Sequence, residues 1–518
     1  MFLLRCIPDG LVATAAARAF VHANAAVPAR EPESRITTEL EPYTEEEFLR
    51  ERGADVESAV YAEMRTARDS LNAFVTSGRG QPVERSKRRP MILALRRLRR
   101  ALRRPGLDAT QSWFGWETLL LACERFALTP ALPASAVRLV QDIIVGGLRV
   151  PGPTWDANFD EHGSFGGPAP HVPAASAAMY LRANYPSMTS PESIELAARD
   201  RFRPARARVA HLLPLLQKDS PTLMWRLAAN FARRDRSAGV AHAFASSLGR
   251  LIWADPSRGS ELLWTTHRRS VKRQWSAARA ACESLFLWRA LGGDRKADAA
   301  VDALLGQRND RAEDVKKMLY ELRSYVRGPD ARLRSAAASL FERAARLFAA
   351  DYDQALSEGL STNPEVARAV FGNLVELSTE LYFASGAYVG ADEAESDPSS
   401  DLGFFDAIYP ALERLRKVGI PAAVHKLLET LEHFVDARPE RVYDLFVDLV
   451  AAGSTQGFQY EYLGAQAAVK IMEDYLAGHR DVIESSTSRR EAFLKTLDAF
   501  ALWPNAVRIA YRFDEIFR

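Results

Sequence analysis

Cysteine is scarce in this sequence: the 518 residues include three, at Cys6, Cys123 and Cys282. They stand far apart and form no CxxC pair, so the sequence offers neither a disulfide framework nor a paired-cysteine metal knuckle. This usage fits a reducing compartment. We therefore expect a cytoplasmic protein with no metal ion and no cofactor.

Long hydrophobic runs are also missing. Charged residues or proline interrupt every apolar stretch before it reaches the roughly 18 residues that a membrane-spanning helix needs. The Ala-rich stretch 10–26 resembles a weak signal peptide, but Arg18 and His22 interrupt its apolar part. We therefore interpret this stretch as an ordinary helix or a truncated element, and we expect no membrane partner.

No excess of charge of either sign is present. Lys plus Arg number 68 and Asp plus Glu number 66, which gives a net charge of +2. Global attraction to nucleic acid or to a membrane is thereby excluded, and any electrostatic partner must bind locally. Arginine outnumbers lysine 58 to 10, which we interpret as coding bias in a GC-rich bacterial genome. With 47% apolar residues, the chain has ample material for a buried core, which excludes a disordered protein.

The motifs of nucleotide binding and hydrolysis are absent from the sequence. It contains no GxxxxGK[ST], GxGxxG, GxSxG or HExxH pattern. The nearest glycine-rich stretch, 163–168, follows no predicted strand and has no lysine. We expect no catalytic residues and no enzymatic activity.

Strand signals are nearly absent, whereas apolar residues with helical spacing are abundant. One such series is Leu333, Ala337, Leu340, Ala344 and Leu347. Helix breakers recur at spacings of about 34 to 41 residues, at 219–221, 255–256, 292–294, 328–330, 363–364, 397–398 and 438–439. Asp or Asn before a helix supplies an N-cap, and proline suits the first helical position. Each breaker is therefore predicted to start a new repeat.

Two of these starts, Pro364–Phe371 and Pro439–Phe446, share a proline, a following glutamate, and an apolar pair six and seven residues on. This pattern resembles the first helix of HEAT-like repeats, which are antiparallel helix pairs stacked into a solenoid. The predicted fold class is thus all-α, an α-solenoid of helical hairpins. The alternative is a non-repetitive all-α domain.

The distribution of breakers divides the chain into four parts. Residues 1–82 form an irregular helical segment, with a capped helix starting at Thr44. Residues 83–145 are helical and include a basic helix, and residues 146–173 form a Gly/Pro-rich loop or boundary. Residues 174–518 form the repeat region, and its helix breakers recur most clearly from Asp219 onward. Within it, the acidic stretch 390–403 is expected to be a mobile insertion.

The strongest local charge lies at 85–104, where ten of twenty residues are Arg or Lys and none is acidic. On a helical wheel, an apolar seam of Met91, Leu95, Leu98 and Leu102 opposes the arginines. The candidate binding residues are Arg96, Arg97, Arg100, Arg103 and Arg104. They suit a nucleic-acid backbone or an acidic partner protein. Alternatively, glutamates of residues 31–63 neutralise them within the chain.

Two weaker patterns have structural explanations. His425, Glu429 and His433 share one helix face at metal-ligand spacing, but Lys426 and Glu432 favour an ordinary ion-paired surface. Several tryptophans accompany the basic residues Arg268, Arg269, Lys272 and Arg273 and could stack on bases. For these tryptophans we favour packing between helices; they are Trp225, Trp253, Trp264, Trp275 and Trp288.

The end of the chain, with Gly457–Glu461, Ala467–Tyr475 and the closing RIAYRFDEIFR of Arg508–Arg518, is similar to the helical-repeat tails of large bacterial signal-transducing ATP-binding proteins of the antiphage type. That family's nucleotide-binding module is missing here. The resemblance therefore implies only a scaffold or sensor role. Its partner would be a protein, such as an NTPase or effector encoded nearby; nucleic acid is the alternative ligand.

Overall fold

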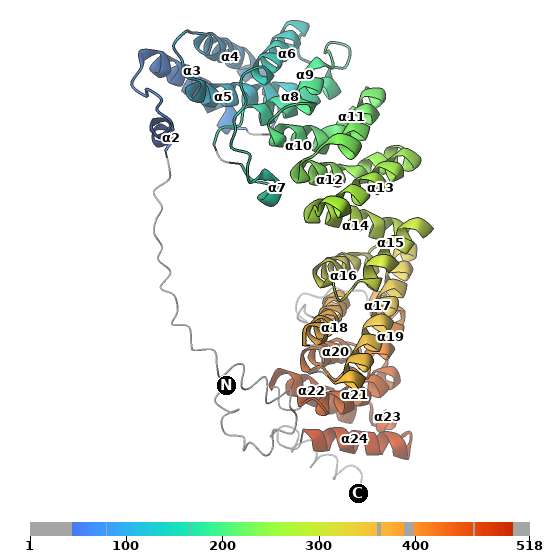
Figure 1. The fold of residues 1–518 in the computed structure, drawn as a ribbon. Coiled ribbons are helices and arrows are strands. Elements are labelled where there is room, and N and C mark those ends of the chain that lie inside the picture. The colour runs from blue at the N-terminus through green and yellow to red at the C-terminus, as the bar shows by residue number, and fades with distance from the viewer. Residues whose placement is uncertain are drawn as a thin grey trace. The chain divides into compact units, whose positions relative to one another are not determined.

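The computed structural model describes residues 44–78, 80–165, 167–359, 364–387, 398–458 and 462–500. They fall into two compact units, an N-terminal unit that ends at Leu285 and a C-terminal unit that starts at Phe286. Throughout the described ranges the regular elements are helices, and no strand occurs (Figure 1). The predicted all-α class is confirmed. None of the helices in these ranges combines the length and apolarity that crossing a membrane requires.

The N-terminal unit begins with the short helix α2 (Glu45–Glu51) and continues through α13; its last helix, α14 (Ser276–Leu291), extends past Leu285. The intervening helices are α3 (Ala59–Thr76), α4 (Arg88–Ala101), α5 (Ala109–Leu128), α6 (Ala134–Leu148), α7 (Phe159–His162), α8 (His171–Asn184), α9 (Glu192–Ala198), α10 (Arg203–Leu212), α11 (Pro221–Arg234), α12 (Ala238–Ala254) and α13 (Pro256–Arg273).

The C-terminal unit contains ten further helices among its described residues. They are α15 (Arg295–Gly306), α16 (Ala312–Val326), α17 (Ala331–Glu358), α18 (Pro364–Ser385), α19 (Pro398–Leu415), α20 (Pro421–Glu432), α21 (Pro439–Ser454), α22 (Tyr462–Gly478), α23 (Arg480–Glu484) and α24 (Thr487–Ala499).

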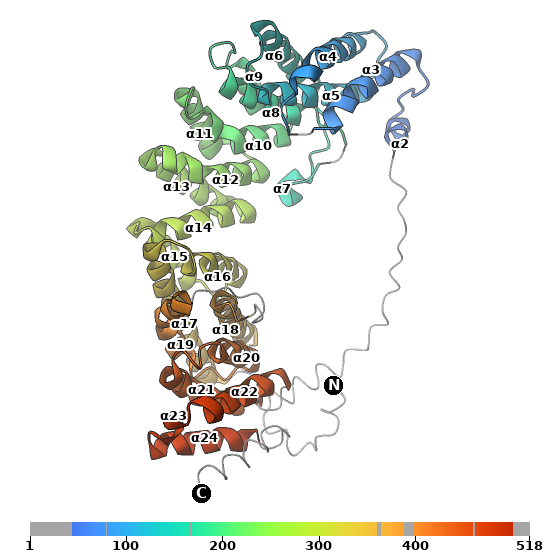
Figure 2. The same ribbon diagram turned by 180° about the vertical axis from the view of Figure 1, so that it is seen from behind.

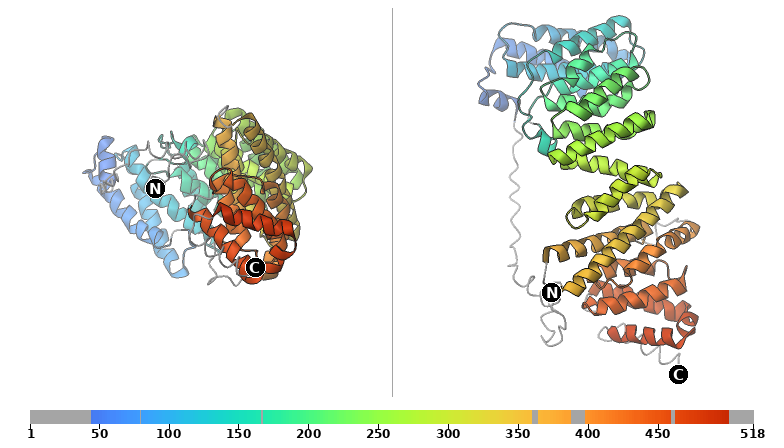
Figure 3. Two further views of the ribbon diagram at one scale, coloured as in Figure 1. Left: turned by 90° about the horizontal axis from the view of Figure 1, so that it is seen from below. Right: turned by 45° about the vertical axis from the view of Figure 1, so that its right-hand side comes forward.

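Helices that are two apart in the chain pack against each other, which is the signature of stacked helix pairs. In the C-terminal unit α16, α18, α20 and α22 form one layer, and α17 packs on α19 in the other (Figure 2). In the N-terminal unit α8, α10 and α12 form one layer and α11 packs on α13 (Figure 3). Each unit is therefore a helical-repeat stack, and the predicted α-solenoid of antiparallel hairpins is confirmed.

The predicted helix starts are confirmed at the described breakers. Asp255, Asp294 and Asp330 are N-caps of α13, α15 and α17, and each carboxylate accepts hydrogen bonds from backbone N–H groups of the first turn. Pro221 and Pro439 occupy the first position of α11 and α21. These residues start helices because they satisfy or remove the backbone donors that a helix leaves unpaired at its N-terminus.

The repeat register differs from the prediction at Pro364. This proline begins α18, the second helix of the α17–α18 pair, rather than a new pair. The cause is the length of α17, which continues for 28 residues without a breaker. Pro439, in contrast, begins α21, which packs on α20 and α24 and lies outside the layer formed by α16, α18, α20 and α22. The likeness of the two segments therefore reflects a shared helix start and not equivalent places in the repeat.

Two predictions for the first half of the chain can be compared with the structure. Thr44 and Glu47 form a reciprocal capping box at the start of α2, as expected. The Gly/Pro-rich segment 146–173 contains the short helix α7, and the other described residues from 149 to 170 are not helical. Helices α5 and α6 before it pack on α8 after it. The segment is therefore a loop inside the N-terminal unit.

Apolar side chains fill the space between the helix layers. In the C-terminal unit one continuous cluster of buried residues extends from Leu287 to Phe500. Cys123 and Cys282 are free thiols buried in the N-terminal unit, where burial raises the pKa of each well above its ordinary value. Both behave as small core residues and not as reactive groups.

The contact between α12 and α13 predicts the effect of one added methyl group. A Cβ at Gly259 would lie 2.6 Å from Cα of Ile252 and 2.8 Å from its backbone nitrogen. Because backbone cannot move aside as a side chain can, we expect Gly259→Ala to lower the free energy of unfolding by about 1–3 kcal/mol. Urea titration followed by circular dichroism measures this loss.

The matched control is Gly146→Ala in α6. A Cβ on residue 146 would lie 3.5 Å from Cη2 of Trp116, which is an ordinary van der Waals contact. Alanine should therefore leave stability unchanged or raise it by up to about 1 kcal/mol, through its higher helix propensity. Equal effects of the two substitutions would contradict the close approach of α12 and α13.

Candidate interaction surface

The basic helix predicted from the sequence is α4, and its apolar seam packs into the N-terminal unit. Met91, Leu95 and Leu98 are fully buried, and α4 packs on α3 and α5. Leu102, just beyond the helix, is half-buried and packs against Gly115 of α5. A Cβ placed on Gly115 would lie 2.7 Å from Cδ2 of Leu102. This packing fixes the opposite side of α4 toward solvent.

All five candidate arginines lie on that exposed side: Arg96, Arg97, Arg100, Arg103 and Arg104. We call them the α4 arginine surface. Arg104 pairs with Glu63 of α3, with Nη1 2.8 Å from Oε2. The other four form no ion pair with any residue that the structure describes. Internal neutralisation by residues 31–63 thus holds for one arginine, while residues 31–43 lie outside the described ranges.

An exposed leucine lies among these arginines. Leu93 is 59% exposed, and at 100° per residue it falls on the same side of α4 as Arg97 and Arg100. The surface therefore offers one apolar contact within a group of positive charges. Such a combination suits a protein surface better than a bare phosphate backbone.

Like charges crowd at this end of α4. The pKa of Arg99 is lowered, first by partial burial and then by repulsion from Arg103, although Asp142 opposes the shift. Repulsion between neighbouring guanidinium groups costs folding energy unless an anion binds between them. Among the described residues, four of the five arginines of the α4 arginine surface are thus left without a compensating ion pair.

Arginines elsewhere in the chain are used differently, because many of them bridge helices. Arg206 pairs through two nitrogens with Asp235, and Arg308 pairs in the same way with Asp351. Arg269 of α13 donates to backbone carbonyls at the C-terminal end of α11, including that of Ala232 at 2.6 Å. Arg327, just beyond α16, likewise donates to the carbonyls of Ala384 and Ser385 at the end of α18. These side chains are internal connectors.

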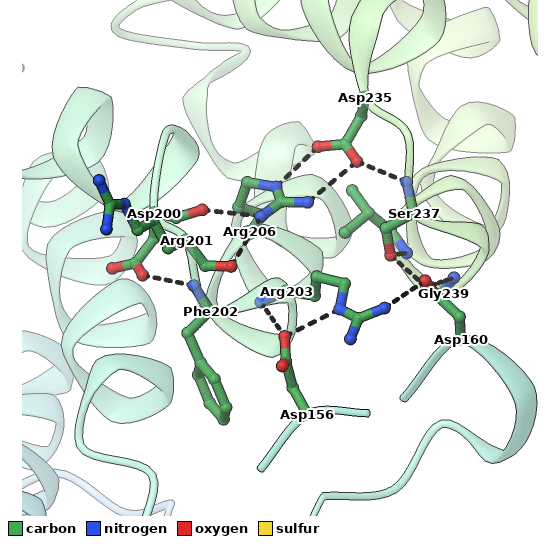
Figure 4. A network of polar contacts seen from close by, with 11 residues as sticks. Asp156, Asp160, Asp200, Arg201, Phe202, Arg203, Arg206, Asp235, Ser237 and Gly239 are labelled. Atoms are coloured by element: carbon green, nitrogen blue, oxygen red, sulfur yellow. Dashed lines mark hydrogen bonds and ion pairs between the residues drawn. The ribbon is translucent and has the colours of Figure 1, made fainter. Parts of the chain in front are cut away.

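A dense polar network holds the Gly/Pro-rich loop in place (Figure 4). Arg203 of α10 donates from Nε to Asp156 at 2.8 Å and from Nη1 to Asp160 at 2.6 Å. Asp160 also accepts from the hydroxyl of Ser237 and, at 3.0 Å, from the backbone N–H of Gly239 at the start of α12. The loop is therefore fastened to α10 and α12.

The network keeps both carboxylates ionised. Burial opposes ionisation of Asp156, but hydrogen bonds from Arg203 outweigh it and lower the pKa of Asp156. Burial likewise opposes ionisation of Asp160, and bonds from Ser237, Gly239 and Arg203 outweigh it, so its pKa is also lowered. Because both carboxylates accept hydrogen bonds from donors of the chain itself, we interpret the network as structural.

These shifts predict the pH dependence of folding. A carboxylate whose pKa is lower in the folded state stabilises that state above its unfolded pKa, near 4, and loses this contribution as pH falls through the folded value. We therefore expect the free energy of unfolding to decline as pH is lowered from about 5 to about 3. In Arg203→Leu the pKa of each aspartate should return toward normal. Urea titrations at several pH values should then show a lower stability at neutral pH and a shallower decline.

Substitution at Arg226 gives the control for this prediction. Arg226 pairs with Glu195 on the exposed surface of the same unit, where screening by solvent makes ion pairs weak. Arg226→Leu should keep the wild-type decline. A decline of wild-type steepness in Arg203→Leu would show that the loop carboxylates do not control acid stability.

The tryptophans do not all pack as predicted. Trp225, Trp264, Trp275 and Trp288 are half-buried, whereas Trp253 at the end of α12 is 76% exposed, so the packing interpretation is wrong for Trp253. Guanidinium groups lie over Trp275, with Cζ of Arg273 5.3 Å and Cζ of Arg269 5.5 Å from the ring centre. Since Arg269 is held by α11 carbonyls, this ring rests on an internal connector.

In the histidine and glutamate series at α20, Glu429 forms an ion pair with Lys426, and burial lowers the pKa of His425. Lys426 Nζ is 2.6 Å from Oε2 of Glu429, and Nε2 of His425 is 3.5 Å from the same oxygen. The ring of His433 lies edge-on to that of Phe434. Within the described ranges no group of three or more His, Cys, Asp or Glu side chains is arranged to hold a metal ion.

Comparison with known proteins gives little further guidance. No protein-family model matches the chain, and no curated protein sequence matches it. Among solved structures, it is similar to a chain of a homology model of the full-length AP-3 complex in an intermediate open conformation. That likeness has a TM-score of 0.30 and 10% sequence identity, and it covers 86% of this chain and 90% of the other. The helical-repeat assignment therefore rests on the helices and their packing described above.

Proposed function

We propose that this chain is a non-catalytic helical-repeat scaffold or sensor that binds an acidic partner protein through the α4 arginine surface. The resemblance of the chain's end to the helical tails of antiphage ATP-binding proteins supports an NTPase or effector encoded nearby as that partner. Part of this resemblance, the stretch Arg508–Arg518, lies outside the described residues.

The observation that carries the proposal is the contrast between two classes of arginine. Connectors such as Arg206 and Arg308 each form an ion pair with an aspartate of the same chain. Arg96, Arg97, Arg100 and Arg103 are exposed and have no such partner among the described residues. A group of cations that the fold holds rigidly without neutralising them supports a function outside the fold.

The architecture suits this role. Stacked helix pairs present long surfaces whose side chains are fixed by the packing beneath them. The buried seam of α4 holds the helix backbone in place, so an anionic partner meets arginines that are already oriented. Preorganisation of this kind makes even a small charged surface selective.

Nucleic acid is the second candidate, because a phosphate backbone would neutralise the same four arginines. The exposed Leu93 and the net charge of +2 favour a protein partner over this alternative. The two candidates differ in their dependence on salt. Release of counterions from about four phosphates gives a slope of log affinity against log salt near −4 on duplex DNA.

We expect Arg96→Gln, Arg97→Gln, Arg100→Gln and Arg103→Gln, combined in one variant, to bind labelled poly-L-glutamate at least tenfold more weakly than the wild type at low salt, as four charge contacts are lost. The fold should persist, because Met91, Leu95 and Leu98 are untouched. Fluorescence anisotropy measures binding, and circular dichroism measures the fold.

The control variant carries the same four-charge change at other exposed arginines, Arg199, Arg234, Arg236 and Arg250. It should bind poly-L-glutamate as the wild type does. Equal loss in both variants, or no binding by the wild type, contradicts the proposal. Duplex DNA bound with a slope near −4, combined with negligible binding of poly-L-glutamate, replaces the protein partner with nucleic acid.

A further inference from the structure

A group of four carboxylates, two of them paired, lies in the C-terminal unit, on α20, α22 and the turn that follows α20. We call it the acidic cluster; it consists of Glu432, Asp436, Glu473 and Asp474. Lys470 pairs with Glu432, and Nε2 of His479 is 2.8 Å from Oδ1 of Asp436. Glu473 and Asp474 form no ion pair with any residue in the described ranges.

Electrostatic crowding in this cluster mirrors that on α4. Partial burial raises the pKa of Asp474. The positive charge of Lys470 is the next largest effect and lowers this pKa, whereas Glu432, Asp436 and Glu473 each raise it by less. The side chain of Asp436 is 96% exposed, and Glu473 is exposed as well. The cluster therefore presents excess negative charge to solvent, where a cation can reach it.

The two charged surfaces are complementary in sign. Four unpaired arginines project from α4, and four carboxylates gather on α20, α22 and the following turn. The chain as a whole carries a net charge of only +2, so two copies experience little long-range repulsion. One chain thus contains both halves of an electrostatic interface.

We propose that the α4 arginine surface of one copy binds the acidic cluster of a second copy. This inference rests on the proposed function, since it identifies the acidic protein that the arginines recognise as another molecule of the same chain. The two surfaces are different patches, so the contact is heterologous. An open assembly keeps one free surface of each sign at its two ends, and it either closes into a ring or extends as a filament.

Sedimentation velocity tests the association directly. At about 50 mM salt the weight-average mass should exceed the 57.5 kDa of the monomer and rise with protein concentration. At about 500 mM salt, where charges on the surface are strongly screened, it should return to the monomer value. A protein that stays monomeric at both salt concentrations overturns the proposal.

Charge reversal identifies the surfaces. One variant carries Arg96→Glu and Arg100→Glu, and the other carries Asp436→Lys and Glu473→Lys. Each variant alone should be monomeric at low salt. In each variant the reversed surface now has the same sign of charge as the native surface that it would meet on a second copy. Mixed in equal amounts, they should associate again, since the native arginines of the second variant meet the native acidic cluster of the first. Rescue upon mixing is a result that misfolding of either variant cannot produce.

A control with Arg236→Glu and Arg250→Glu changes the charge by the same amount at exposed positions outside α4 and should associate like the wild type. Failure of the mixture to associate, or association of either reversed variant alone, overturns the proposal. If poly-L-glutamate binds to α4 while the wild type remains monomeric, self-association fails but the proposed function stands. If neither occurs, both fail.

Discussion

The structure depends on the fact that one pair of amphipathic helices cannot bury its own apolar surface. Helix α18 illustrates the constraint, since it packs on α17 within its pair and on α16 and α20 in the neighbouring pairs. Leu374, Leu377 and Leu381 of α18 are completely buried as a result. Removing either neighbour would expose them, so the stability of each pair belongs in part to the next one.

Stacking the helix pairs also requires hydrogen-bond partners for the carbonyl groups at the helix ends, and arginine side chains provide them. The last carbonyl groups of a helix have no partner within it, and stacking brings them close to the adjacent pair. Arg269 reaches from α13 to the end of α11, and Arg327 reaches from the end of α16 to the end of α18. A guanidinium group has five N–H donors in a fixed plane, so one side chain can satisfy several carbonyls at once. Each bridge also fixes how far one helix pair is displaced along the next. Whatever origin the arginine-rich composition has, the fold uses much of it in this way.

The sequence was sufficient for features that depend on neighbours along the chain. Asp294 predicted a helix start because its carboxylate needs only the N–H groups two and three residues on. The division of α4 into arginines and a buried seam followed from the helical period alone. The repeat register did not follow, because the length of α17 makes Pro364 start a second helix instead of a pair. The exposure of Trp253 was also missed, since the interpretation rested on residue type.

Contacts between distant segments were beyond prediction from the sequence. Arg203 meets Asp156 and Asp160, which precede it by 47 and 43 residues, and no local signal distinguishes these aspartates from others. The acidic cluster was missed for the same reason, as Asp436 and Glu473 come from different helices and share a surface only after stacking. Arg104 had been grouped with four other arginines, yet the structure pairs it alone with Glu63.

Clustered charge that remains unpaired among the described residues is therefore the feature on which the proposed function rests. Composition cannot reveal it, because 68 basic and 66 acidic residues nearly cancel. Part of that cancellation is local, as Arg308 with Asp351 and Arg438 with Asp406 show, and such pairs present little net field to a partner. Where local pairing fails, neighbouring like charges repel each other. Binding of an oppositely charged surface relieves this repulsion and so favours the complex. Among the described residues, four arginines at α4 and, around α22, Glu473 and Asp474 meet this condition. Arg96, Arg97 and Arg100 lie on α4, and Glu473 and Asp474 lie on α22, so the helix backbone sets their spacing.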